Sequence, residues 1–241
     1  MTTLAPLEAP KGDVAETATY ISQPRAKRSF NTVLDASRIF AHGGRSTVVT
    51  RTKGSGAERR VHLETKHPLR GGTIIETFEL GAAPHLIALR LERKLLDAEG
   101  VASREERIDF RRGPLELPEA CYPEVMLPFI LRWQPLAGPK RSFYAWIVDR
   151  FVAKVYYEVG KTVTLELPAG RFEAIEAVMY PDLNDWVNLG TVVTNLAKPL
   201  LPKYRMWFEK AAPHRVVKFE GPYGPPGAPE IVLELAKPES P

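Results

Sequence analysis

The 241-residue sequence contains a single cysteine, Cys121. One cysteine excludes an intramolecular disulfide and any site built from several cysteines, and it is typical of a reducing compartment. No run approaches the roughly 18 apolar residues of a transmembrane helix. The N-terminus, as written, has no basic start followed by an apolar stretch, so it does not fit a secretory signal peptide. We expect a cytoplasmic protein, or a periplasmic one if an export signal was replaced or truncated.

Motifs for catalysis and cofactor binding are also missing. The sequence has no G-x-S-x-G, no phosphate-binding glycine loop and no H-E-x-x-H. Of the histidines, His62 and His67 are five residues apart and would point to opposite faces of a strand. Asp182 and Asp185, the closest acidic pair, are better explained as caps of a helix start. We therefore predict no enzymatic activity, no cofactor and no metal site, while a hydrolase or isomerase with a site outside known motifs stays open.

Proline is abundant, with 22 residues beside 17 glycines. Each proline removes a backbone donor and blocks helix interiors, which disfavours a helical bundle. From Thr32 the chain instead shows short apolar alternations between turn residues, which predict strands. Ile74, Glu76 and Phe78, for example, share one face. We predict a mainly β protein of ten to twelve strands, an antiparallel curved sheet or incomplete β-barrel with one or two inserted helices.

Turn residues divide these strands. The segment 97–100 (DAEG) predicts a type I turn with a left-handed glycine, and Pro168-Ala169-Gly170 predicts a second hairpin loop. Gly160-Lys161 suits a type II′ turn between two further strands. Two segments predict helices: Tyr122–Trp133, which Pro128 would kink or split, and Leu183–Leu196, with Asp182 or Asn184 as its cap. We expect the sheet to wrap around the second of these helices.

The predicted domain organisation is simple. Residues 1–28 have no apolar periodicity and are predicted to be a flexible arm. Residues 29–236 are predicted to be one β-rich domain, with a possible boundary in the Pro- and Gly-rich region 111–140. Residues 237–241 are predicted to be a tail.

Basic residues gather between Arg38 and Arg70, where eight of them stand against two acidic residues. Such a surface attracts anionic partners, but strand exteriors also carry charges for solvation and edge protection. Only one aromatic residue, Phe40, lies within this stretch, which weakens a base-stacking role, so we do not expect a nucleic-acid partner. The candidate basic surface consists of Arg45, Arg51, Lys53, Arg59 and Arg60.

Aromatic residues concentrate in the C-terminal half. In the strand around Lys203–Glu209, Tyr204 shares a face with Met206 and Phe208, whereas Trp207 shares the other face with charged residues. Core packing is the simplest role for most of these rings, but the concave face of an open sheet would form an apolar pocket lined by some of them. The candidate ligand-binding residues are Tyr144, Trp146, Trp186, Tyr204 and Trp207, with Arg205 or Arg215 meeting an anionic headgroup.

The C-terminal half also carries a resemblance to a known architecture. The run with Pro168-Ala169-Gly170, then Trp207-Phe208 and Pro213-His214-Arg215, resembles an uncharacterised bacterial β-rich family. That family is similar in architecture to the periplasmic lipoprotein carriers and their outer-membrane receptors. The resemblance covers roughly residues 140–236 and implies an open half-barrel with helices in its mouth and an apolar cavity.

These observations lead to two functional hypotheses. The first is a non-enzymatic binding module whose curved sheet shelters an apolar or lipid-like small molecule, such as an acyl chain, or the hydrophobic segment of a protein partner. The alternative is a structural or assembly protein of a larger complex that uses the basic surface.

Overall fold

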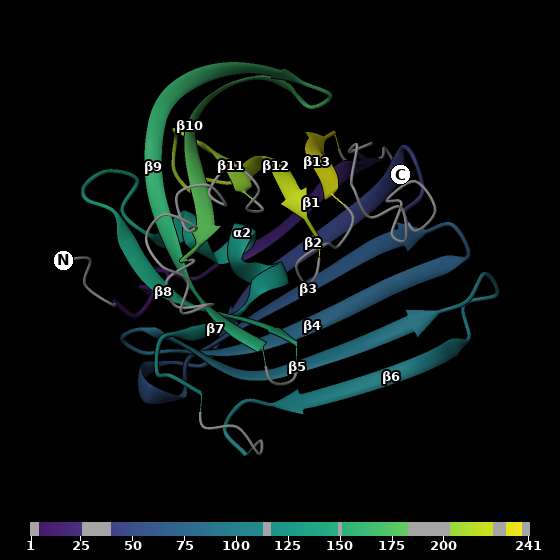
Figure 1. Ribbon diagram of the computed structural model, residues 1–241, viewed down its shortest axis with the longest axis horizontal. Coiled ribbons are helices and arrows are strands. Elements are labelled where there is room, and N and C mark those ends of the chain that lie inside the picture. The colour runs from purple at the N-terminus through teal and green to yellow at the C-terminus, as the bar shows by residue number, and fades with distance from the viewer. Residues whose placement is uncertain are drawn as a thin grey trace, which may run out of the picture.

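The structure of the protein is a computed structural model that describes residues 5–25, 40–112, 117–148, 151–182, 203–223 and 230–237. These residues form one thirteen-stranded sheet in the order β6-β5-β4-β3-β2-β1-β13-β12-β11-β10-β9-β8-β7 (Figure 1). Every neighbouring pair is antiparallel except β7 and β8. The sheet is curved and does not close into a barrel, because no pairing joins its two edge strands. The predicted fold class is confirmed.

The elements have the following bounds. The strands are β1 (Ala15–Pro24), β2 (Gly44–Lys53), β3 (Arg60–Leu69), β4 (Gly72–Ala82), β5 (Leu86–Leu96), β6 (Ala102–Asp109), β7 (Cys121–Pro123), β8 (Arg141–Val148), β9 (Phe151–Leu167), β10 (Gly170–Pro181), β11 (Tyr204–Glu209), β12 (Val216–Pro222) and β13 (Glu230–Ala236). The helical turns are η1 (Gly56–Glu58), η2 (Glu124–Met126), α2 (Leu127–Ile130) and η3 (Leu131–Trp133).

The N-terminal region corrects the prediction of a flexible arm. Strand β1 lies inside the sheet between β2 and β13, and Tyr20 on it is buried. Leu7 is buried as well, and its backbone N–H donates to the Tyr122 hydroxyl at 2.9 Å. The alternation in β1 is carried by Ala18, Tyr20 and Ser22, a mixture of small and polar residues that gives little hydrophobic signal.

Two of the three predicted turns are confirmed. Asp97 accepts a hydrogen bond from the Gly100 N–H, and Gly100 has a φ of 81°. Pro168 and Ala169 connect β9 to β10. The predicted turn at Gly160 is wrong, because β9 runs without interruption through this glycine. The register with β10 shifts opposite it, between Ile175 and Ala177, and a glycine inside a strand often marks such a bulge.

The segment Glu124–Trp133 fills the concave side of the sheet (Figure 1). The predicted helix is not continuous: it consists of η2, α2 and η3. Pro128 does not split it, because this residue lies in the first turn of α2, where a proline is tolerated, and Tyr122 belongs to β7. Met126, Leu127 and Ile130 are completely buried, so this segment acts as a core plug. The predicted helix over Leu183–Leu196 lies outside the described residues.

The two ends of the sheet approach each other without pairing. The Tyr122 hydroxyl on β7 donates to the Leu86 carbonyl of β5 at 3.0 Å. The rings of Trp146 on β8 and Phe110, just after β6, meet edge to face with centroids 5.3 Å apart. These contacts explain why Trp146 is buried although it lies near an edge of the sheet.

The β9–β10 hairpin forms an arch above β11, β12 and β13 (Figure 1). The tip of the arch is anchored to β13, because the Ala169 N–H donates to the Leu235 carbonyl at 3.0 Å. Val163, Leu165 and Phe172 of the arch are partly buried against the core. The arch therefore adds a row of partly buried apolar side chains to the core.

Candidate functional site

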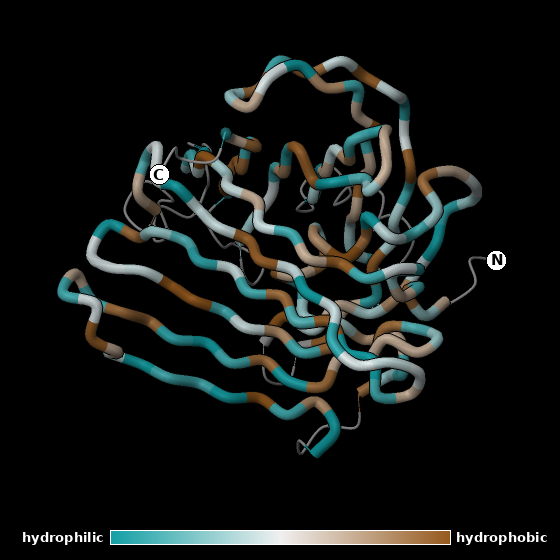
Figure 2. The backbone as a smooth tube through the Cα atoms, turned by 180° about the vertical axis from the view of Figure 1, so that it is seen from behind, coloured by the Kyte–Doolittle hydropathy of each residue, from teal (hydrophilic) through white to brown (hydrophobic). Residues whose placement is uncertain are grey.

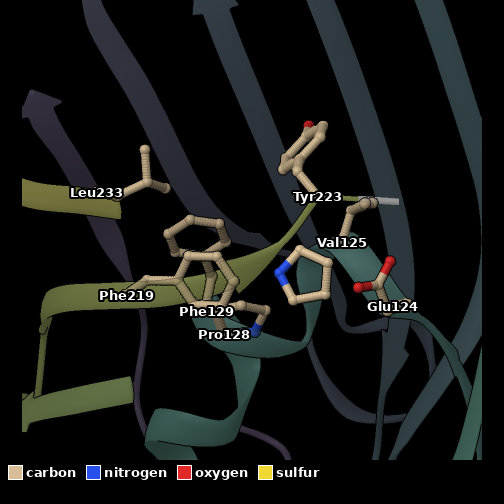
Figure 3. Close-up of a pocket in the computed structure, with 8 residues that line it drawn as sticks. Glu124, Val125, Pro128, Phe129, Phe219, Tyr223 and Leu233 are labelled. Atoms are coloured by element: carbon tan, nitrogen blue, oxygen red, sulfur yellow. The ribbon is translucent and has the colours of Figure 1, made fainter. Parts of the chain in front are cut away.

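A small apolar pocket lies where the plug meets the strands β12 and β13 (Figure 3). The pocket is small: the centre of a water molecule can move within a volume of about 10 Å³. This space holds about one water molecule. Apart from Glu124 and Tyr223, the side chains around it are apolar. The plug contributes Val125, Pro128 and Phe129, and the strands and their ends contribute Phe219, Pro222 and Leu233.

Each polar residue of the pocket, Glu124 and Tyr223, has a hydrogen-bond partner that does not line the pocket. The buried Glu124 carboxylate is hydrogen bonded to Tyr204 of β11, and burial together with this carboxylate raises the pKa of Tyr204 well above its ordinary value. The Tyr223 ring stands at the pocket edge, with its hydroxyl pointing away from Phe129 and Phe219 (Figure 3). The space that remains is thus suited to an apolar group rather than a polar one.

The Tyr223 hydroxyl belongs to a polar ladder on the concave face. It donates to the Glu76 carboxylate of β4, which is completely buried. Arg93 of β5 lies opposite Glu76, with 2.8 Å from its Nε to Oε1, and Arg93 also reaches Glu106 of β6 at 3.0 Å. Burial and the Glu76 charge raise the pKa of Tyr223 well above its ordinary value, so this phenol stays protonated and acts as a donor.

A second polar row adjoins this ladder. The His67 Nδ1 lies 2.8 Å from the Ser46 hydroxyl, which in turn bonds Ser22. Burial lowers the pKa of His67 to about 4, so the ring is neutral at pH 7. Its ring meets the Tyr223 ring edge to face with centroids 4.9 Å apart. Tyr223 therefore connects the apolar pocket to both polar rows.

Burial limits the chemistry that the polar and thiol groups of this region can perform. Ser46 and His67 are completely buried, so a substrate cannot reach either side chain. No carboxylate that the structure describes bonds His67 to orient it as a general base. Burial raises the pKa of Cys121 to about 12, so this thiol is a poor nucleophile. Within the described ranges, no three His, Cys, Asp or Glu residues gather as metal ligands do, and no helix has the length and hydrophobicity to span a membrane.

The structure does not bring the predicted ligand-binding aromatics together. Tyr204 is on the concave face, where it meets Glu124. Trp146 packs on Phe110 near the sheet edges, and Tyr144 beside it on β8 is half-buried. Trp186 lies outside the described residues.

Trp207 lies on the opposite face of β11 from Tyr204, as the alternation predicts. It is buried nevertheless, because Arg205 and Lys218 cover its ring at 5.0 and 5.5 Å from the centroid. The structure thus places Trp207 away from the concave face, as part of a small convex cluster.

The two arginines predicted to meet a headgroup are both engaged with carboxylates. Arg205 bonds Glu176 at 2.5 Å, on the convex side of the sheet. Arg215 bonds Glu209 at 2.9 Å. Neither residue lines the apolar pocket.

The five predicted basic-surface residues do not form a continuous positive face. Arg51 and Lys53 are exposed on β2. Arg45 donates to the Lys237 carbonyl at 3.2 Å. Arg59 turns toward the N-terminal segment and donates to the Pro10 carbonyl at 2.6 Å, and Arg60 lies 3.9 Å from Glu79. Lys53 lies opposite Arg60 across the β2–β3 ladder, so basic residues meet there, but Glu64 and Glu79 place carboxylates on the same face. A mixture of both signs is typical of a solvated sheet exterior.

Sequence reasoning missed the pocket residues Phe129, Phe219 and Leu233, and it missed Tyr223. One signal for the polar ladder was present, since Glu76 interrupts the apolar face that it shares with Ile74 and Phe78. A charged residue on the core face of a strand needs a buried partner.

Comparisons with known proteins give no assignment. No family model matches the chain, and no curated protein or solved structure is significantly similar to it. The resemblance to the lipoprotein carriers therefore rests on the turn and strand motifs alone.

Proposed function

We propose that the protein is a non-enzymatic binding module for an apolar, lipid-like ligand. The observation that carries this proposal is the apolar pocket between the plug and β12–β13, bordered by Val125, Phe129 and Leu233. Burial of apolar groups in such a pocket supplies roughly 25 cal/mol per Å² of buried surface. The terminal methyl group of an acyl chain matches the pocket in both size and polarity.

The rest of the acyl chain would lie beneath the β9–β10 arch. Val163, Leu165 and Phe172 of the arch are only partly buried, so they retain apolar surface that a ligand can cover. The arch tip is held at Leu235, two residues beyond the pocket residue Leu233. A single chain would then contact the pocket and the arch together.

A fluorescence titration with 11-(dansylamino)undecanoic acid tests the proposal. The wild-type protein is expected to bind this probe with a saturable increase in emission, and the Val125→Trp variant is expected to bind at least tenfold more weakly. Val125 lines the pocket and is partly buried, so the larger side chain occupies the space that the ligand needs.

Val101→Trp is the matched control. Val101 is 62% exposed in the turn before β6, so the same substitution there leaves the pocket unchanged and should leave probe binding unchanged. No saturable binding by the wild type, or an equal loss in both variants, would overturn the proposal. Displacement of the probe by a hydrophobic peptide but not by unlabelled fatty acids would instead assign the pocket to a protein partner.

A further inference from the structure

The sheet has one exposed edge among the residues that the structure describes. Strand β7, at one end of the sheet order, is only three residues long and is buried. Strand β6, at the other end, is eight residues long and mostly exposed. It forms the lower border of the sheet in Figure 1, and its tube is mainly hydrophilic in Figure 2.

The hydrogen-bond pattern shows which backbone groups of β6 are free to pair. The Phe110 N–H donates to the Leu89 carbonyl at 3.0 Å, so this pair is a hydrogen-bonded one, and such pairs alternate along an antiparallel ladder. The backbone N–H and C=O groups of residues 108, 106 and 104 therefore form hydrogen bonds with β5. The N–H and C=O groups of Arg107 and Asp109 point away from the sheet.

We propose that β6 pairs antiparallel with β6 of a second copy of this chain, about a two-fold axis at Ile108. In this register Ile108 lies opposite Ile108 of the second copy. Arg107 lies opposite Asp109 of the second copy, and Asp109 opposite its Arg107. The outward backbone groups of Arg107 and Asp109 then form the new ladder.

The charges on the convex face favour this register. Within one chain, Arg107 is paired with Glu92 across the β5–β6 ladder, at 3.5 Å, and Asp109 lies opposite Arg90. Joining two copies gives the row Glu92–Arg107–Asp109–Arg90, in which the sign alternates at every step. Opposite charges directly across a strand pair are stabilising, and like charges are destabilising.

The neighbouring registers each place like charges opposite each other. An axis at Glu106 also sets Glu105 opposite Arg107 of the second copy, but it makes the Glu106 carboxylate face its own copy. An axis at Glu105 makes two Glu105 carboxylates face each other, and an axis at Arg107 does the same with two guanidinium groups. The axis at Ile108 instead joins two apolar side chains, and it continues the apolar row that Ile108 makes with Leu91 of β5.

Edge strands commonly use charges and bulges to prevent pairing. Strand β6 has a bulge, but the register shift lies at its start, between Leu95 and Leu96 of β5. The residues that pair in the proposed register lie at the other end. The bulge therefore leaves the pairing residues in regular register, but β6 ends at Asp109. The contact is a short ladder, and we expect a reversible dimer that depends on concentration.

Cysteine cross-linking of the full chain tests the register. Ile108→Cys is expected to form a disulfide-linked dimer under mild oxidation, because facing Cα atoms of a non-hydrogen-bonded pair are about 4.5 Å apart. Arg104→Cys is the control. This residue is exposed on the same strand. In the proposed register its two copies are offset by eight residues along the ladder, which separates them by about 27 Å. The native Cys121 is buried and does not compete.

Light scattering after size-exclusion chromatography tests association itself. The wild type is expected to shift from monomer toward dimer as concentration rises, and Arg107→Pro should remain monomeric, since proline removes an N–H that points away from β5. Circular dichroism confirms that this variant is folded. Asp109→Arg should also weaken the dimer, because it sets basic side chains opposite each other at positions 107 and 109. A wild type that stays monomeric, or cross-linking at residue 104 equal to that at residue 108, would overturn the proposal.

Discussion

The hydroxyl of Tyr223 donates a hydrogen bond to the carboxylate of Glu76, a residue 147 positions earlier in the chain. This contact ties the end of β12 to the concave face of β4, across the inside of the curved sheet. It also satisfies a fully buried charge, which Arg93 neutralises from the neighbouring strand. Because Tyr223 lines the apolar pocket as well, the same residue holds the pocket wall and closes the polar ladder.

Tyr223→Phe tests the strength of this tie. Loss of the hydroxyl leaves the Glu76 carboxylate with one donor fewer in a buried site, so the free energy of unfolding should fall by about 1–3 kcal/mol. Urea unfolding followed by circular dichroism measures the change. Tyr180→Phe is the matched control, because its hydroxyl also donates to a glutamate, Glu158, but at an exposed position. The control should change stability by less than about 0.5 kcal/mol.

The strands were predictable where one face is buried and the other is exposed to solvent. In β5, Leu91 is buried while its neighbours Arg90 and Glu92 reach toward solvent, and this contrast is what period-2 alternation detects. Strand β1 was not predicted because it is central in the sheet and its core face carries Ala18, Tyr20 and Ser22 rather than aliphatic residues. The turn predicted at Gly160 was wrong because a glycine permits both a turn and a bulge.

The candidate site was less predictable. Its pocket depends on how the plug residue Phe129 meets Phe219 and Leu233, and curvature of the whole sheet determines that meeting. Local pattern identified Glu76 as an unusual core residue, but nothing near it in the sequence identifies Tyr223 as its donor. Contacts between such distant residues follow from tertiary packing, which short-range periodicity does not encode.

The buried His67 predicts a specific loss of stability in acid. Burial lowers its pKa from 6.5 to about 4, so between these values the unfolded chain binds a proton that the folded chain does not. The free energy of unfolding therefore falls as the pH drops from about 6.5 to 4, and His67 contributes about 3 kcal/mol to this decline.

Urea unfolding at several pH values between 4 and 7 measures this contribution. His67→Asn keeps a polar group beside Ser46 and should flatten the decline relative to wild type. His62→Asn, on the convex face of the same strand, leaves His67 in place and should preserve the decline. Identical pH profiles for the wild type and His67→Asn would show that another group causes the acid sensitivity.

The ion pair between Glu16 and Arg132 anchors the plug to β1. The Arg132 Nη2 lies 2.6 Å from Glu16 Oε2, and the two side chains are only 6% and 18% exposed. Glu16→Gln leaves the guanidinium largely buried without an opposing charge, so the free energy of unfolding should fall by about 3 kcal/mol. Glu166→Gln breaks the exposed pair with Arg171 and should change stability by less than about 0.5 kcal/mol. Equal effects in urea unfolding would contradict a buried anchor.

Phe129→Leu separates the pocket from the rest of the core. Phe129 is 4% exposed and lines the pocket, so the smaller side chain should enlarge the space while costing about 1–3 kcal/mol of stability. If an apolar ligand enters there, the dissociation constant of 11-(dansylamino)undecanoic acid should fall at least threefold. Phe143→Leu makes the same change in a fully buried ring that does not line the pocket.

The comparison of these two variants isolates the effect of the added space. Both should lose a similar amount of stability, since each removes part of a buried ring, but only Phe129→Leu should bind the probe more tightly. Tighter binding by both variants would point to general loosening of the core rather than to a ligand site. Unchanged binding by Phe129→Leu would mean that the ligand does not reach the space between the plug and β12–β13.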